Sequence, residues 1–373
     1  MQTELLAVDD ADLQDFLYDG GWTDGLPVVA PTEEAVAAML AGAGIDSADG
    51  GQPIGSIPSH QATLDAEHAA VAAVMAGCLP EYFPVVLAAL AAALDPAFNL
   101  QVACTSTGGA AICVVVSGPL AAQIGMNAGH NALASGNRAN ATIGRAVRLA
   151  AVNLLRTQLD GTEGTSLGHP GKYSFCFAER ADDGWGSLHA GLGYHDDVTT
   201  VTVAPTSGPI QVANHLNADP DGVAASLAAA MRMPSSFSAG KGAAQFVIAL
   251  GPEHEVALRE GGWTRADLRR ELTVRSRIRA QDLLDAGVLL EQGSHHDMVP
   301  DADGFLGTVS DPDDIVVVTT GGAGGGWSAV IPSWAPKKHA QVVSRRVRLP
   351  GEKLPDCGPD GCAIDWDAIE GRL

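Results

Sequence analysis

Two stretches of this chain align with each other without a gap, and this internal echo limits the possible folds more than any other feature. The first is "VVVSGPLAAQIGMNAG" at 114–129, and the second is "VIALGPEHEVALREGG" at 247–262. Each begins with an apolar run typical of a buried strand, continues with Gly-Pro, and then has a short helical pattern that ends in glycine. Proline suits the first position of a helix, because its missing N–H would have no partner there. The echo therefore predicts an α/β fold with two related halves, in which alanine-rich helices pack on mixed sheets.

The length of 373 residues suits two domains. We expect an N-terminal α/β half over 1–190, a C-terminal α/β half over 191–350, and a cysteine-containing tail over 351–373. Apolar periodicity and capping residues predict strands and helices within these halves. The expected strands are 112–119, 197–205, 245–250 and 314–320, and the expected helices are 136–155, 221–232, 252–260 and 264–275.

The chain is strongly acidic, with a formal net charge of −22. A surface of this sign repels nucleic-acid phosphates and anionic lipids, so we expect neither nucleic acid nor a membrane as a partner. Basic residues gather at 265–279 and 337–348, which we interpret as a helix face and a surface strand. The longest apolar run, 84–94, is too short to span a bilayer, and the N-terminus lacks the basic segment of a secretory signal. The sequence thus predicts a soluble cytoplasmic protein, in which six cysteines are not by default a disulfide framework.

A glycine-rich segment, "TTGGAGGGWSAVIPSW" at 319–334, follows a strong strand pattern. Glycine lets a ligand approach the backbone closely, and consecutive free N–H groups form an anion-binding nest. The segment matches neither a Walker A motif nor a dinucleotide fingerprint. We predict that it binds substrate, and the alternative is a flexible turn. The candidate residues are Gly322, Gly324, Gly325 and Ser328.

The start of the helix expected at 136–155 is a second candidate for substrate binding. Asn137, Arg138 and Thr142 lie there, where the helix dipole favours an anion and an arginine offers a forked pair of donors. A carboxylate or a phosphate would fit such a site. The alternative is an ordinary N-cap with an arginine that pairs with one of the many acids.

Two further segments carry candidate catalytic residues. "GHPGKYSFCFAE" at 168–179 places His169, Lys172 and Cys176 within eight residues, and a thiol near a cation can become a nucleophile. If 173–178 is a strand, alternation puts Cys176 opposite Phe175 and Phe177, and the alternative is then an inert buried thiol. Cys104, which precedes Thr105, Ser106 and Thr107, is the better candidate nucleophile, whereas Cys113 and Cys78 belong to packing.

Metal binding is possible in two places. His295 and His296 stand in an acidic loop, "GSHHDMVPDADG", and imidazole with carboxylate suits zinc, iron or nickel. Cys357 and Cys362 in the tail are separated by four residues, which is not the spacing of a zinc ribbon or a thioredoxin-like site. Together with the histidines they would bind zinc, iron, copper or nickel, or they would act as a catalytic dithiol. The alternative is a pair of surface thiols, and we interpret His130 and His254 as structural.

Several motifs together resemble a known family. "GWTDGLPVVAPTEEAV", "GNRANATIGRAVRL" and "LGHPGKYSFCFAE" are similar to those of largely uncharacterised bacterial proteins associated with UGSC-type (seleno)proteins. The resemblance covers about 20–335 and implies a bacterial origin and a thiol or selenol redox protein as partner. It carries no catalytic residues over. The segment "ACTSTGGA" and the dicysteine tail depart from the family pattern.

Three functions are compatible with these patterns. The leading hypothesis is a cysteine-dependent enzyme for a small, carboxylate-bearing substrate, which uses thiol redox or C–S or C–X bond chemistry with the tail dithiol as reductant or metal clip. The second is a metal-dependent lyase or hydrolase that uses Cys357 and Cys362 or the 295–303 loop. The third is a non-catalytic partner subunit of a UGSC-type redox protein. In each case we expect a homo-oligomer.

Overall fold

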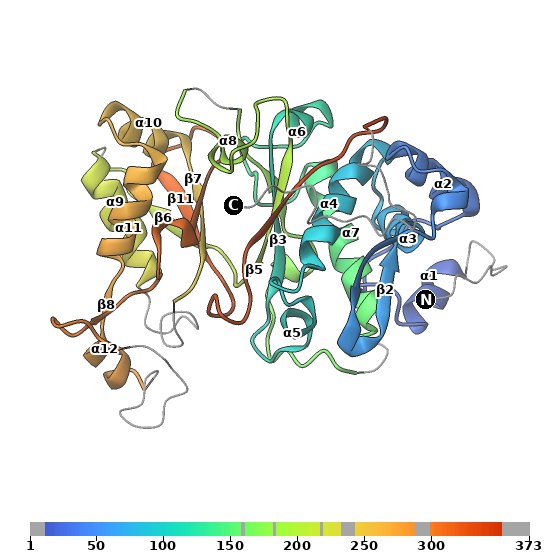
Figure 1. Ribbon diagram of the computed structural model, residues 1–373, viewed down its shortest axis with the longest axis horizontal. Helices are drawn as coiled ribbons and strands as arrows, with labels where there is room; N and C mark the ends of the chain where they lie inside the picture. Colours follow the sequence, from blue (N-terminus) through green and yellow to red (C-terminus); the bar gives the residue numbers. More distant parts are fainter. Residues whose placement is uncertain are drawn as a thin grey trace, which may run out of the picture.

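Four layers make up the architecture: helices, a sheet, a second sheet, and helices again (Figure 1). The predicted α/β class is confirmed. The computed structural model describes residues 12–157, 161–181, 184–216, 219–232, 243–287 and 299–352.

The first sheet has the strand order β12-β5-β3-β4. Its strands β3 and β4 are parallel, with Val114 opposite Cys176, and the other neighbours are antiparallel. All seven residues of β3 and of β5 are buried, which fits a sheet covered on both faces. The bounds are β3 (Ala111–Ser117), β4 (Cys176–Ala178), β5 (Thr200–Thr206) and β12 (Val343–Arg346).

The second sheet has the order β10-β7-β11-β6. Strands β10 and β7 are parallel, and β11 runs antiparallel to both β7 and β6. The bounds are β6 (Ile210–Ala213), β7 (Phe246–Leu250), β10 (Ile315–Thr319) and β11 (Trp327–Pro332).

Alanine-rich helices cover the outer face of the first sheet. Ala69, Ala70 and Ala73 of α3 are fully buried, because so small a side chain lets neighbouring helices approach closely. Asp65 caps the start of α3 by accepting from the His68 N–H, and Gly77 ends it with φ of 88°. The helices are α2 (Glu33–Gly42), α3 (Ala66–Ala76), α4 (Phe83–Ala93), α5 (Leu100–Thr105) and α7 (Arg138–Leu155).

Three helices cover the outer face of the second sheet. They are α9 (Pro220–Met231), α10 (Pro252–Glu260) and α11 (Arg265–Arg275). A capping box begins the last of them, since Thr264 Oγ1 accepts from the Asp267 N–H while Asp267 Oδ2 accepts from the Thr264 N–H. The remaining elements are α1 (Leu13–Asp19), α6 (Pro119–Gln123), α8 (Leu188–Gly191), α12 (Ala280–Asp285), β1 (Pro53–Ile57), β2 (Ala62–Asp65), β8 (Ile278–Arg279) and β9 (Phe305–Leu306), with short 3₁₀ turns η1 (Ser47–Asp49), η2 (Pro58–His60), η3 (Pro80–Tyr82), η4 (Pro170–Lys172) and η5 (Pro312–Asp314).

A third apolar core fills the space between the two sheets. Phe177 of β4 belongs to it together with Val318 and Ile331 of the second sheet, whereas Cys176 belongs to the core under the helices of the first sheet. The alternation that the sequence predicted for this strand is therefore confirmed.

The internal echo corresponds to real similarity of structure. Gly118 and Pro119 connect β3 to α6, and Gly251 and Pro252 connect β7 to α10. The two halves are nevertheless not consecutive along the chain, because β5 and β12 join the sheet of β3 and β4. The boundary expected at residue 190 therefore does not separate the two sheets. None of the described helices is long and apolar enough to cross a bilayer.

Candidate functional site

The parallel strands of the two sheets end at the same place. The Arg180 N–H, just after β4, donates to Thr319 O at the end of β10 over 2.7 Å, and Thr320 Oγ1 donates to Ala178 O over 2.9 Å. We call the residues that follow these strands, 117–118, 179–180, 251–255 and 319–328, the strand-end junction. Ligands of open α/β sheets bind beyond the carboxyl ends of the strands, so the junction is the first place to look for a site.

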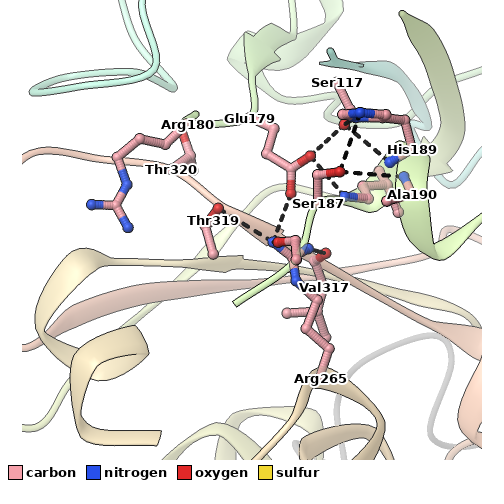
Figure 2. Close-up of polar contacts among 12 residues, drawn as sticks. Ser117, Glu179, Arg180, Ser187, His189, Ala190, Arg265, Val317, Thr319 and Thr320 are labelled. Carbon is pink, nitrogen blue, oxygen red and sulfur yellow. Dashed lines mark hydrogen bonds and ion pairs between the residues drawn. The ribbon is translucent and has the colours of Figure 1, made fainter. Parts of the chain in front are cut away.

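A buried hydrogen-bonded chain lies within the junction (Figure 2). Ser117 Oγ donates to Glu179 Oε2 and lies 2.9 Å from His189 Nδ1, and Ser187 Oγ lies 3.3 Å from His189 Nε2. Since the Ser117 hydrogen is used on Glu179, His189 Nδ1 must be the donor to Ser117. The chain fixes the imidazole between two hydroxyl groups, and it holds the ends of β3 and β4 to α8.

Arg265 of α11, which packs on the second sheet, forms an ion pair with Glu179 of this hydrogen-bonded chain. Its Nη2 lies 2.9 Å from Glu179 Oε1, and its Nη1 donates to Val317 O over 2.8 Å. The guanidinium also lies 5.2 Å from the ring of Trp185, within range of a cation–π interaction. The Glu179 side chain is only 2% exposed, so the arginine supplies the charge that its carboxylate needs in the interior.

Arg180, the next residue after Glu179, points the other way (Figure 2). Its guanidinium forms an ion pair with Glu255 Oε2 in the first turn of α10, and its side chain is 29% exposed. Its Nε is buried and has no hydrogen-bond acceptor among the described residues. Arg180 therefore brings a partly exposed cation with an unused donor to the junction.

The glycine-rich segment forms a nest, and the nest holds a carboxylate of the protein itself. Glu253 Oε1 accepts from the Gly324 N–H over 2.8 Å and from the Gly325 N–H over 3.0 Å. Burial raises the pKa of Glu253, but these backbone hydrogen bonds outweigh it and the pKa lies below its ordinary value. Two N–H groups of the segment thus hold an anion, the Glu253 carboxylate, and substrate binding by Gly322, Gly324, Gly325 and Ser328 stays a prediction.

Beneath the glycine segment lies a Ser–His pair. Ser328 Oγ lies 2.7 Å from His254 Nδ1, and His254 Nε2 lies 3.2 Å from the carbonyl oxygen of Asn214. A carbonyl only accepts, so Nε2 carries the hydrogen and Nδ1 accepts from Ser328. Burial lowers the pKa of His254, although the Asn214 carbonyl acts in the other direction. The pair is a neutral base hydrogen-bonded to a hydroxyl group, and a carbonyl fixes its tautomer.

Two more histidines border the glycine segment. A Cβ at Gly322 would lie 2.3 Å from the His130 ring, and a Cβ at Gly325 would lie 3.0 Å from His215 Nδ1. The His215 ring meets the Trp327 ring edge-on, with 5.2 Å between centroids. Glycine is required at these positions because any side chain would displace an imidazole.

The predicted binding residues at the start of α7 have internal partners. Asn137 caps the helix by accepting from the Asn140 N–H, and Thr142 Oγ1 donates back to Arg138 O. Arg138 donates from Nε and Nη2 to the carbonyl oxygen of Gly77. These contacts match the N-cap alternative, except that the arginine pairs with a carbonyl and not with an acid. Substrate binding by these three residues stays a prediction.

The structure brings Cys104 and Lys172 into one cluster through residues that the sequence interpretation did not include. Arg148 Nη1 lies 3.4 Å from Cys104 Sγ, and Arg148 Nη2 lies 2.8 Å from Glu163 Oε2. Lys172 Nζ lies 2.9 Å from the other oxygen of Glu163 and 2.8 Å from Thr165 Oγ1. Cys104 is buried, and burial raises the pKa of its thiol despite the neighbouring guanidinium.

The side chains of the other candidates in the same segment have partners of their own. His169 Nε2 lies 3.4 Å from Thr206 O, and burial lowers the pKa of His169. Cys176 is buried in β4, and burial raises the pKa of its thiol well above the ordinary value. That environment matches the alternative of an inert core cysteine.

The predicted metal ligands His295, His296, Cys357 and Cys362 lie outside the described residues, so the metal site and the tail dithiol stay predictions. Within the described ranges, no group of three or more His, Cys, Asp and Glu side chains is arranged to hold a metal ion.

Sequence reasoning missed the strongest polar groups of the junction. Arg180 follows directly after the quoted 168–179 segment, and His254 lies two residues after Pro252 of the Gly-Pro echo. Polar residues placed directly after predicted strands were the available signal, because strand ends of α/β sheets collect functional groups.

Comparison of the chain with models of known protein families and with curated proteins finds no match.

Proposed function

We propose that the chain is an enzyme that binds a small, carboxylate-bearing substrate at the strand-end junction and acts on it by proton transfer. One observation carries this proposal: the Arg180 side chain is 29% exposed, its buried Nε has no acceptor among the described residues, and its guanidinium meets the first turn of α10, which also bears His254. A guanidinium fork matches the two oxygens of a carboxylate, and this geometry makes arginine the preferred residue for such ligands.

The Gly324 and Gly325 N–H groups already hold one carboxylate, that of Glu253, which supports the choice of a carboxylate over other anions. His254 is neutral at neutral pH, so it can accept a proton, and the Asn214 carbonyl would stabilise the imidazolium that forms.

A binding experiment tests the anchor. Small mono- and dicarboxylates are titrated into the protein by calorimetry, and the same titrations are made with Arg180→Lys. Lysine keeps a charge for Glu255 but loses the fork, so we expect affinity to fall by at least about tenfold. Arg269→Lys, in an exposed pair with Asp313, is the matched control and should bind like the unaltered protein. Equal affinity in Arg180→Lys would contradict the proposal.

Turnover is tested on the carboxylates that bind. Each is incubated with the protein in D₂O, and its ¹H spectrum is followed for exchange of C–H protons or for new products. His254→Asn keeps an amide near the position of Nδ1 but cannot take up a proton, so it should retain binding and lose the reaction. A reaction that continues unchanged in His254→Asn would rule out this base.

A second function, thiol chemistry at Cys104, is supported by the contact between Arg148 Nη1 and Cys104 Sγ at 3.4 Å. A guanidinium at this distance favours the thiolate, which is the nucleophilic form. The test compares Cys104→Ser with Cys113→Ser. Cys113 is a core cysteine whose thiol pKa is raised by burial. Only Cys104→Ser should abolish a thiol-dependent reaction, and equal effects of the two would dismiss this function.

A further inference from the structure

Strand β6 is an edge strand of the second sheet. It pairs with β11, and no other described strand lies beyond it. The Asn214 N–H donates to Gly326 O over 2.8 Å, so the regular alternation of an antiparallel ladder turns the backbone groups of Gln211 and Ala213 away from β11. Both residues are exposed. The strand therefore presents N–H and carbonyl groups in the geometry that another strand needs.

The edge lacks the charges that commonly protect such strands. No Asp, Glu, Lys or Arg occurs at 198–218 or at 315–336, the stretches that contain β6 and β11. Charged residues make up 18% of the whole chain, so their absence here is a local property. Natural edge strands often carry charged side chains, which oppose pairing with a further strand. At β6 nothing of this kind opposes it.

Large apolar side chains border the same edge. Trp327 lies opposite Ala213 in the ladder and is 46% exposed, and Leu216, three residues after β6 ends, is 99% exposed. A single exposed apolar residue is ordinary on a protein surface. Two of them beside unpaired backbone groups instead mark a surface that gains from being covered.

We propose that β6 pairs with β6 of a second copy of this chain, antiparallel and about a two-fold axis at Val212. Gln211 of one copy then lies opposite Ala213 of the other, and the two exchange both of their backbone hydrogen bonds. An axis at Gln211 would place Ala213 opposite Pro209, which has no N–H to donate. An axis at Ala213 would place Gln211 opposite His215, which lies beyond the end of the strand.

Charge favours a second copy as the occupant of this edge. The formal net charge is −22, so two copies repel each other over most of their surfaces. Close approach costs least where charged side chains are absent, as they are along β6. A basic protein would be attracted to the acidic surfaces instead of an uncharged strand. A two-fold axis also makes the two edges equivalent, so one pairing satisfies both copies.

Analytical ultracentrifugation of the purified protein, with no other protein present, tests the pairing. We expect a species of twice the chain mass of 38.2 kDa that dissociates on dilution. Ala213→Pro removes an outward N–H, and proline is tolerated on the free side of an edge strand, so it should raise the dissociation constant at least about tenfold. Gln211→Glu places a negative charge near the axis in both copies and should also weaken the dimer.

Gln123→Glu is the matched control, because it adds the same charge at an exposed position of α6 and should leave the dimer unchanged. Circular dichroism checks the folding of each variant, and Gln211→Glu still tests the pairing if Ala213→Pro does not fold. A protein that stays monomeric at about 100 µM would overturn the proposal. A dimer that neither edge variant weakens more than Gln123→Glu does would also overturn it.

Discussion

Arg265 Nη2 lies 2.9 Å from Glu179 Oε1, and this ion pair joins the helical layer of the second sheet to the end of a strand in the first. Both side chains are mostly buried, at 14% and 2% exposed. The pair therefore links the two halves at Glu179, the residue that precedes Arg180, our proposed substrate anchor.

Replacing Glu179 by alanine should strongly destabilise the fold. Removing one partner leaves the Arg265 charge buried and unpaired, which costs about 3–5 kcal/mol of unfolding free energy. Urea unfolding measures the loss. Asp313→Ala breaks an exposed pair with Arg269 and should cost less than about 1 kcal/mol. Equal unfolding midpoints for the two variants would show that the buried pair does not hold the halves together.

Replacement by alanine should destabilise the protein at one glycine of the glycine-rich segment and have little effect at another. A Cβ at Gly326 would lie 2.1 Å from the carbonyl oxygen of Asn214 and 2.9 Å from His254 Nε2, so the backbone must shift. Gly324 has nothing within 4 Å of such an atom. Gly326→Ala should therefore cost about 1–3 kcal/mol by thermal unfolding, and Gly324→Ala should change stability by less than about 0.5 kcal/mol. A destabilised Gly324→Ala with an unaffected Gly326→Ala would contradict the packing described here.

His254 should make the protein less stable in acid. Burial lowers its pKa from the ordinary 6.5, so the unfolded chain binds this proton more readily than the folded one. The stability that comes from neutral His254 is thus complete above about pH 6.5 and is lost as the pH falls through that value toward the lower folded pKa.

The measurement compares unfolding free energies of the unaltered protein and His254→Asn between pH 7.5 and pH 5. His169 also has a lowered pKa and contributes to both, so only the difference between the two proteins reports on His254. Their stability difference should shrink with acidification. A difference that is constant with pH would mean that His254 titrates normally.

The four cysteines of the described ranges should resist alkylation in the folded protein. Cys78, Cys104, Cys113 and Cys176 are all buried, and burial raises the pKa of Cys78 to about 12. Thiols react as thiolates, so iodoacetamide at pH 8 should modify these four at least about tenfold more slowly than in guanidinium, as quantified by peptide mass spectrometry. Rapid labelling of Cys104 alone would instead indicate that Arg148 keeps it reactive.

Local sequence patterns were sufficient to predict many of the helices and strands, but not β6 or β11. The helix expected at 252–260 is α10 with the same bounds. The helix expected at 264–275 is α11, and Thr264 and Asp267 form the capping box at its start. The Gly-Pro echo predicted two strand–turn–helix units, which β3 and β7 begin. These features depend on residues within a few positions of one another, so a single sequence contains them.

Contacts between distant residues were decided by the tertiary structure alone. Neither the crossing of β5 and β12 into the first sheet nor the pairing of Glu179 with Arg265 has a local signal, because strand pairing and buried ion pairs depend on which segments meet in space. The sequence indicated that a glycine nest should bind an anion, but only the fold placed Glu253 in it and paired Arg180 with Glu255. By itself, the sequence determined the helices, the strands and the chemical groups available, and the face-to-face packing of the two sheets determined which of those groups meet.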